Sequence, residues 1–361
     1  MSLPATRAPR KPRLAITMGD PAGVGPEIII KAFAAEELAS FCCPVVYGDL
    51  GVLARAVRLL GHELELVEVS EQASFEPEPP GAEGAATSAI RVVPRSRLRL
   101  EEVPFGALSE AGSRAMADYV RGAALRVRDG GADAVVTCPI TKEGLKLAGE
   151  PFPGHTEMLA TLCGGARVVM MLAGERLKVA LVTIHVALRR ALELLDAPLI
   201  EETIRTTDRF FRTYLACAAP RIAVAGLNPH AGEGGLFGDE EARLIAPAIA
   251  ACRSSGIDVL GPFPPDTVFH RAYHGQFDVV VAMTHDHGLI RLKLVHFDDG
   301  VNVTMGLPIL RTSVDHGTAY DIAGTGKAKP TSLLAALRMA ARMASLRAAE
   351  PEPRDARDPG H

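Results

Sequence analysis

Short apolar segments alternate with helix-like segments along most of this chain, and this alternation restricts the fold more than any other feature. Segments with the composition of buried strands span 14–20, 44–49, 132–140, 179–185, 221–230 and 278–286. Helix-like segments follow within 21–33 and over about 50–60, 110–129, 187–196, 198–216 and 239–255. Strands that alternate with helices are typical of parallel sheets covered on both faces. We therefore expect an α/β fold with mostly parallel sheets between two layers of helices.

The size and charge of the chain exclude several classes of function. Its 361 residues are enough for about two domains, each with its own core. The net charge of −4 argues against a nucleic-acid-binding protein, because no basic field covers the chain. No apolar run approaches the roughly 18 residues of a membrane span, and the N-terminal segment lacks the apolar core of a signal peptide. We expect a cytoplasmic protein with neither nucleic acid nor membrane as a partner.

The cysteines favour reduced thiols rather than disulfides or a thiolate metal site, because no CxxC pair is present. They are Cys42, Cys43, Cys138, Cys163, Cys217 and Cys252. Cys138 follows an apolar strand and is the one nearest a possible site. Even there, a buried structural thiol is the favoured interpretation.

Histidines follow several of the predicted strands directly. His185, His230 and His285 (or its neighbour Asp286) each lie at the carboxyl end of such a segment. In open α/β sheets, sites form beyond the carboxyl ends of strands, so these imidazoles can converge on one metal ion. The alternative is that each is a polar residue that ends a strand. The sequence spacing matches no metal motif and leaves both interpretations open.

The segment 285–327 contains groups suited to an anion. Lys293, Asn302 and Arg311 follow His285 at intervals of about nine residues, and a glycine-rich turn, HGTAYDIAGTG, comes next. Lysine and arginine supply positive charge, and glycine lets backbone N–H groups approach a phosphate closely. This combination predicts an enzyme that acts on a small anionic substrate.

Other motifs are less specific. GHTE offers His155 and Thr156 to a phosphate or forms a helix cap. GDPAGVGPE departs from the dinucleotide and Walker patterns, so it is either a nucleotide loop or a tight turn between strand and helix. Asp266 and Asp286 are carboxylates near a metal site or ordinary caps. Histidines in polar surroundings are expected at the surface: His62, His270, His274, His296 and His361.

Taken together, the motifs resemble the 4-hydroxythreonine-4-phosphate dehydrogenase family of pyridoxal phosphate biosynthesis over about residues 12–345. The segments that carry the resemblance are GDPAGVGPE, TCPITKEGLKLAG, FPGHTEMLA, VTIH, LNPHAGEGGLFGDEE, HDHG and GVNVTMGLPILRTSVDHGTAYDIAGTGKA. The resemblance implies a fold like that of isocitrate and isopropylmalate dehydrogenases. We expect a discontinuous first domain (14–130 plus about 305–345), a second domain (131–304) with the histidines, and disordered tails (1–13 and 346–361).

The resemblance also implies cofactors and the roles of site residues. A divalent metal (Zn, Mg, Mn or Co) would be held by His185, His230 and His285. The substrate would be bound by His155, Thr156, Lys293, Asn302 and Arg311. NAD or NADP would be bound by the glycine-rich loop, through His316, Gly317, Thr318, Asp321 and Gly324. The family is a homodimer whose site lies across the interface, with the third metal histidine coming from the other subunit.

This chain departs from the family pattern beside one of the metal histidines. The family has Tyr-His-Asp-Gln where this chain has Thr284, His285, Asp286 and His287, and an apolar residue near Arg291. The expected substrate is 4-phosphohydroxy-L-threonine, oxidised to a 2-amino-3-oxo-4-phosphooxy acid that loses CO2. The departures leave open threonate or erythronate 4-phosphate, or a dihydrodiol acid.

The expected reaction assigns a role to each group. Lys293 and Arg311, with His155 and Thr156, would hold the phosphate and carboxylate ends of the substrate. Asp266 or Asp286, or a water that they orient, would remove the hydroxyl proton while hydride passes to the nicotinamide. Two other classes, a metal-dependent phosphohydrolase and a phosphate acyltransferase, share some of these features. The first does not need the HGTAYDIAGTG loop, and the second does not explain the strand-end histidines.

Overall fold

The computed structural model describes residues 10–35, 38–76 and 89–349. In this part of the chain, twelve strands form one sheet in the order β3-β4-β2-β1-β5-β12-β11-β6-β7-β10-β8-β9. The strands are β1 (Arg13–Thr17), β2 (Cys43–Gly48), β3 (Glu65–Glu68), β4 (Ala89–Pro94), β5 (Ala134–Thr137), β6 (Val169–Ala173), β7 (Lys178–Leu181), β8 (Ile222–Ala225), β9 (Val259–Phe263), β10 (Val279–Ala282), β11 (Val301–Met305) and β12 (Arg311–Val314).

The helices connect these strands and cover both faces of the sheet. They are α1 (Gly25–Ala35), α2 (Leu50–Leu60), α3 (Glu110–Arg128), α4 (Lys142–Leu147), α5 (His155–Leu162), α6 (Leu188–Leu194), α7 (Ala197–Tyr214), α8 (Ala246–Ser254), α9 (Val268–Tyr273), α10 (His285–Val295) and α11 (Thr331–Ala349). The predicted α/β class with a large, mostly parallel sheet is confirmed.

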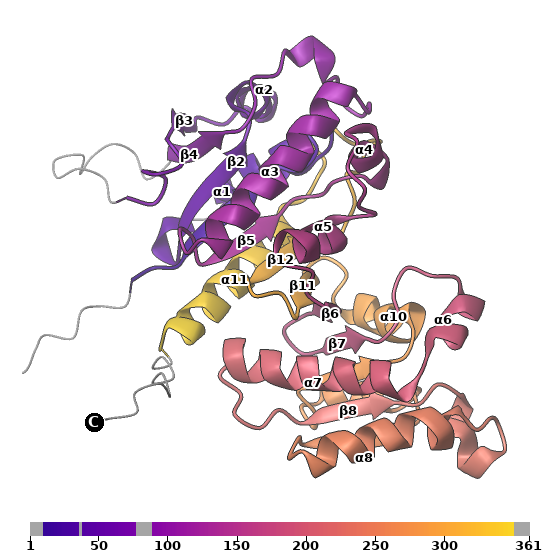
Figure 1. Ribbon diagram of the computed structural model, residues 1–361. Coiled ribbons are helices and arrows are strands. Elements are labelled where there is room, and N and C mark those ends of the chain that lie inside the picture. The colour runs from indigo at the N-terminus through magenta and orange to yellow at the C-terminus, as the bar shows by residue number, and fades with distance from the viewer. Residues whose placement is uncertain (1–9, 36–37, 77–88, 350–361) are drawn as a thin grey trace, which may run out of the picture.

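The sheet consists of two parallel blocks that run in opposite directions. The block from β3 to β12 is parallel, and so is the block from β7 to β9. Between them, β11 pairs antiparallel with β12 and β6, and β6 pairs antiparallel with β7. Figure 1 shows β12, β11 and β6 between the two ends of the molecule. One continuous sheet runs through both predicted domains. The division into two domains stays a prediction.

The two faces of the sheet are covered differently. On one face, a single hydrophobic core extends under both blocks and includes residues of α1, α2, α7, α8 and α11. On the other face there are two separate cores, one under α3 and α5 and one under α9 and α10. Between these two cores, the central strands present polar side chains, which we call the polar strip: Thr137, Asn302, Thr304, Arg311 and Ser313. The site described below lies over this strip.

Alternation along β11 explains how one strand serves both faces. Val301, Val303 and Met305 belong to the continuous core, whereas Asn302 and Thr304 point to the other face. Successive side chains of a strand point to opposite faces, so the sequence VNVTM places its two polar residues on the strip.

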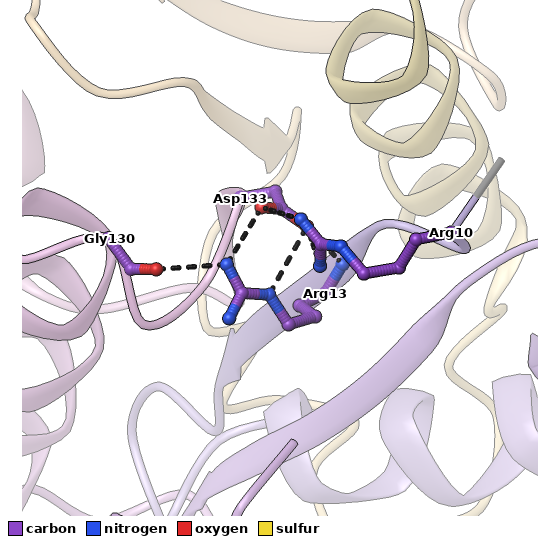
Figure 2. Close-up of polar contacts among 4 residues, drawn as sticks. All are labelled: Arg10, Arg13, Gly130 and Asp133. Atoms are coloured by element: carbon purple, nitrogen blue, oxygen red, sulfur yellow. Dashed lines mark hydrogen bonds and ion pairs between the residues drawn. The ribbon is translucent and has the colours of Figure 1, made fainter. Parts of the chain in front are cut away.

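Ion pairs and hydrogen bonds hold the start of β1 to the segment that precedes β5. The backbone N–H of Arg13 donates to Asp133 at 2.7 Å, and its guanidinium donates to the carbonyl of Gly130 at 2.9 Å. Arg10 donates to both carboxylate oxygens of Asp133 at 3.0 Å (Figure 2). The chain is therefore held to the start of β5 from residue 10 onward. Residues 10–13 belong to the N-terminal tail that was predicted to be disordered.

At the other end, α11 continues past 345 to Ala349. Between the end of β3 at Glu68 and the start of β4 at Ala89, residues 77–88 lie outside the described part. His361 and most of both predicted tails also lie outside the described part of the chain.

One histidine expected at the surface is buried. His296 is only 6% exposed, and its Nδ1 lies 3.1 Å from Asp299. Its ring packs against Gly174, where a β-carbon would lie 2.2 Å from the imidazole. The prediction was wrong because the ring packs against Gly174, which is distant in sequence and therefore not visible in the local polar composition. All six cysteines are free, and Cys138 is fully buried. None of the helices within the described residues combines the length and apolar character that a bilayer crossing requires.

Candidate active site

A cavity of about 530 Å³ lies over the polar strip and brings together residues far apart in the sequence. Its walls come from the segment after β5, the start of α5, the segment after β7, the start of α10, and the loop after β12. The lining includes Lys142, His155, Thr156, Glu157, His185, His285, Lys293, Asn302, Arg311, Asp315, His316 and Gly317. Every substrate-binding residue expected from the sequence lines this one cavity.

Arg311 is the most unusual group in the cavity, because it is buried without a carboxylate partner. Its side chain is 2% exposed and donates to Thr137 Oγ1 at 2.8 Å, to Thr304 Oγ1 at 2.9 Å and to Asn302 Oδ1 at 3.2 Å. Within the described residues it forms no ion pair. Burial lowers the pKa of Arg311 to about 9. A desolvated guanidinium held only by neutral oxygens is costly, and an anion in the cavity would offset that cost.

The first turn of α5 faces the same anion position. His155 and Thr156 line the cavity at the start of this helix, where unpaired backbone N–H groups favour negative charge. The Nε2 atom of His155 is buried and has no hydrogen-bond partner among the described residues. Burial, and then the charge of Arg311, lower the pKa of His155 well below its usual value. The imidazole is therefore neutral at pH 7 and can hydrogen-bond to a ligand.

Further charged residues surround this centre. Lys293 forms an ion pair with Asp315 at 2.8 Å, which holds its ammonium at the edge of the cavity. Lys142 and Glu157 also line the cavity, although no role was predicted for either from the sequence. Lys142 could have been found from its place in TCPITKEG, directly after a buried strand. No sequence pattern pointed to Thr137 and Thr304 as site residues, because only the pairing of β5, β12 and β11 brings them to Arg311.

Two of the three candidate metal histidines lie together at the rim. The ring centroids of His185 and His285 are 5.5 Å apart. His285 Nδ1 is 2.7 Å from Asp286 Oδ1, so the carboxylate fixes that nitrogen as the donor and leaves Nε2 free to bind a metal. A carboxylate behind a ligating imidazole is common in metal sites.

The third histidine does not join them within one chain. His230 is exposed in the segment Pro229–Gly235 and lines neither this cavity nor its neighbour, while its ring faces Phe237 at 6.2 Å. Among the described residues, no group of three His, Cys, Asp or Glu side chains is arranged to hold a metal. A complete three-histidine site therefore requires a residue that this copy does not place there.

The segment around His230 has an unusual backbone. Residues 230–234 all have positive φ, including His230 (51°), Ala231 (52°) and Glu233 (41°). Such conformations cost about 1–3 kcal/mol for a residue other than glycine, so neighbouring groups must hold them in place. Glu241 is one such group, because its Oε1 accepts from the backbone N–H groups of Leu227 and Asn228, each at 2.7 Å. Burial opposes ionisation, but hydrogen bonds from Asn228 and Leu227 keep the pKa of Glu241 below its usual value.

We expect Glu241→Gln to loosen this turn without unfolding the protein. A glutamine amide would face the Asn228 side-chain amide, which now donates to Oε2 at 3.0 Å, so one contact becomes repulsive. Backbone amides of 226–238 should exchange with deuterium faster, and metal affinity should fall about 10- to 100-fold. Asp239→Asn is the matched control, because Asp239 is 72% exposed on the same segment and pairs only with Arg243. Unchanged exchange would show that other contacts hold the turn.

A second cavity of about 460 Å³ adjoins the first at His185 and His285. It is lined by Leu188, Leu192, Leu227 and others, and by Asp286 and His287. The chain turns into α10 at His285 instead of continuing as a strand, which places His287 in this second cavity rather than in the first. Arg291 donates to the carbonyl of His287 at 2.8 Å. The residues that depart from the family pattern therefore line the neighbouring cavity or brace it.

His287→Gln should stay active with unchanged metal content, because glutamine can also donate and accept hydrogen bonds. The Nδ1 of His287 is buried without a partner among the described residues, so no existing bond is lost there. The measurements are metal stoichiometry and the pH–rate profile, which should move only slightly. Loss of one equivalent of metal would make His287 a ligand.

The expected catalytic carboxylates differ in position. Asp286 contacts His285 and lines the second cavity, whereas Asp266 is exposed on the loop before α9 and lines neither cavity. Within one chain, the structure therefore brings Asp286 to the rim of the site and leaves Asp266 outside it.

The glycine-rich loop after β12 borders the first cavity through His316 and Gly317. The remaining expected cofactor residues, Thr318, Asp321 and Gly324, continue along this loop away from the cavity lining. Glu27, fully buried, accepts from the backbone N–H groups of Gly324 at 2.5 Å and Gly326 at 2.9 Å.

The GDPAGVGPE segment takes the form of a tight turn between strand and helix, and it also anchors this loop. Asp20 accepts from the hydroxyl of Tyr320 at 2.5 Å, and the N–H of Val24 donates to the carbonyl of Thr318 at 3.0 Å. Gly19 has a φ of 71°, and a β-carbon there would lie 2.3 Å from the carbonyl oxygen of Pro139, so glycine is required. The segment therefore fixes the position of the glycine-rich loop after β12 and of the residues after β5 that form one wall of the first cavity.

Comparisons with known proteins agree with this geometry. Residues 40–340 match the family model described as "Pyridoxal phosphate biosynthetic protein PdxA". The chain is 51% identical to a 4-hydroxythreonine-4-phosphate dehydrogenase of Geobacter metallireducens, over 93% of this chain and 97% of the relative. It is 46% identical to a D-threonate 4-phosphate dehydrogenase of Salmonella typhimurium, over 92% and 98% of the two chains.

Solved structures give the same result. A 4-hydroxythreonine-4-phosphate dehydrogenase from Klebsiella pneumoniae matches with a TM-score of 0.84 and 43% identity, covering 94% of this chain and all of the other. A terephthalate 1,2-cis-dihydrodiol dehydrogenase from Burkholderia xenovorans matches less closely, with a TM-score of 0.63 and 32% identity over 92% of this chain. The family match, these identities and the cavity around Arg311 together show that the chain belongs to the PdxA family and is a dehydrogenase.

Proposed function

We propose that this protein oxidises 4-phosphohydroxy-L-threonine, with NAD and a divalent metal, to a 2-amino-3-oxo-4-phosphooxy acid that loses CO2, as a step of pyridoxal phosphate biosynthesis. The observation that carries the proposal is Arg311, buried without a carboxylate partner at the floor of a cavity bordered by two histidines. The 51% identity to a protein named for this substrate supports it. D-threonate 4-phosphate is the second candidate, because a relative of 46% identity is named for it.

Different residues of this chain bind the two anionic ends of the proposed substrate. Arg311, His155, Thr156 and the N–H groups at the start of α5 hold one anionic end, through charge and hydrogen bonds. Lys293, held by Asp315 at 2.8 Å, stands at the edge and neutralises the other anionic end. Asn302, bonded to Arg311 through its Oδ1, keeps its amide group available to the substrate.

The histidines fit a divalent metal, since His185 and His285 lie together and Asp286 leaves Nε2 of His285 free. When bound, the metal would supply Lewis-acid activation of the substrate hydroxyl, and NAD would accept the hydride. Asp286, or Asp266 from a second copy, takes the hydroxyl proton directly or through a water. Three imidazoles suit zinc, and a hydroxy-acid substrate adds oxygen ligands that magnesium, manganese or cobalt accept.

A homodimer would complete the site. His230 of a second copy would be the third imidazole, delivered by the exposed turn 229–235. Large apolar side chains at this end of the molecule support a covered surface, because Leu188 is 66% exposed, Leu236 72% and Phe237 45%. The loop from His316 to Gly324, anchored by Glu27, would bind NAD or NADP beside the cavity.

The test is an assay of NADH formation at 340 nm with both phosphorylated substrates in parallel. We expect turnover with 4-phosphohydroxy-L-threonine to exceed that with D-threonate 4-phosphate, and a chelator to abolish both. Higher kcat/KM with D-threonate 4-phosphate would reverse the substrate assignment. Phosphate release without NADH would indicate a phosphohydrolase and reject the proposal.

A further inference from the structure

A third cavity, of about 650 Å³, shares no lining residue with the two cavities above. It lies at the start of β7 and β10, against the ends of α7 and α9 and the side of α11. Because His185 follows the other end of β7, this cavity opens at the opposite end of that strand. Figure 1 shows α7 and α11 extending toward this side of the molecule.

Positive groups gather in this cavity without carboxylate partners. Arg176, Lys178 and Arg342 line it, and none of them forms an ion pair within the described residues. The guanidinium of Arg176 stacks over Tyr273 at 4.0 Å and donates to its hydroxyl at 3.0 Å. Lys178 has only the carbonyl of Glu175 nearby, at 3.5 Å.

The acidic groups of the cavity form no ion pair with these cations in the described part of the chain. Asp278 is occupied by Arg221, which donates to it from the backbone at 2.8 Å and from the side chain at 2.9 and 3.1 Å. Glu175 is exposed at the rim and forms no ion pair in the described part of the chain. Burial, and then the nearby Arg342, lower the pKa of Lys178, and the attraction of Asp278 and Glu175 does not reverse this.

We propose that this cavity is a second anion site, which binds a phosphate group, free or carried by a small organic molecule. Three cations from β7, α11 and the turn before β7 surround a space large enough for such a ligand. Charge-assisted hydrogen bonds from these cations to a phosphate dianion would be stronger than hydrogen bonds between neutral groups. A ligand here would contact both α11 and the strands that lead to the histidines.

The test measures binding of inorganic phosphate and of glycerol 3-phosphate by calorimetry at constant ionic strength. Arg311→Ala serves as the background, because it weakens phosphate binding at the site proposed in the first cavity. We expect this variant to retain one binding site. Adding Lys178→Gln and Arg342→Gln should weaken that binding about tenfold or more, since their charge-assisted hydrogen bonds to the phosphate are lost.

The controls separate this site from general attraction to positive charge. Arg99→Gln, in the same background, removes an exposed cation that pairs with Glu102 and should leave phosphate affinity unchanged. Tighter binding of glycerol 3-phosphate identifies an organic phosphate as the ligand, and equal binding identifies the phosphate ion. No binding in the Arg311→Ala background, or binding that persists without Lys178 and Arg342, would overturn the proposal. Because Lys178 and Arg342 line neither of the other two cavities, the result is independent of the function proposed for the first one.

Discussion

Arg311→Ala should raise KM for the phosphorylated substrate about 10- to 100-fold, because a desolvated charge-assisted contact is worth roughly 1.5–3 kcal/mol. The guanidinium is already fixed by Thr137, Thr304 and Asn302, so little ordering entropy opposes its contact with the anion. Steady-state kinetics of NADH formation give KM. Thermal unfolding with and without substrate gives a second measurement, and the stabilisation by substrate should shrink with it.

Arg311→Lys is the informative companion variant. It retains the charge but cannot donate to both threonines and to the substrate at once, so KM should fall between the values of wild type and alanine. Without ligand, Arg311→Ala should remain folded, because it removes a buried charge that forms no ion pair in the described part of the chain. An unchanged KM in the alanine variant would place the anion elsewhere in the cavity.

His185→Ala, His230→Ala and His285→Ala should each abolish turnover while the protein stays folded. The first two remove exposed side chains and the third a half-buried one, so circular dichroism and the unfolding temperature should change little. Metal content, measured by mass spectrometry, should fall with activity. His270→Ala and His274→Ala are matched controls on the exposed end of α9 and should behave like wild type. A variant that keeps normal activity in the presence of a chelator would show that the substituted histidine is not a metal ligand.

The position of His230 allows a sharper version of this experiment. If His230 completes the site of a second copy, mixing His230→Ala with His185→Ala should restore activity, because some mixed dimers then contain one intact site. Mixing His185→Ala with His285→Ala should restore none, because both residues lie in the same site of one chain. Absence of complementation in the first mixture would show that the sites are not shared.

The sequence by itself determined the α/β class and the order of most elements. Parallel strands that are buried on both faces are continuous apolar runs, so the segments around β1, β2, β5, β7, β8 and β10 could be recognised. It also determined which residues to examine. Charge and spacing pointed to Lys293, Asn302 and Arg311, and the GHTE motif pointed to His155; all four line one cavity.

The antiparallel centre of the sheet could not be recognised in the same way. β11 and β12 contain Asn302, Thr304 and Arg311, and such polar residues read as loop when their partners are unknown. Only the pairing of β12 with β5 and β11 turns these residues into the polar strip between two cores. Strand pairing joins residues that are distant in sequence, so local composition carries little information about it.

Tertiary structure alone decided the electrostatics of the site and the separation of the histidines. Equivalent places at strand ends suggested that His185, His230 and His285 converge, but the left-handed turn at 230–234, braced by Glu241, keeps His230 apart within one chain. In the same way, the sequence shows that Arg311 is an arginine, but not that it is buried without a carboxylate. The cost of a buried charge depends on its neighbours in space, and for Arg311 these come from three strands.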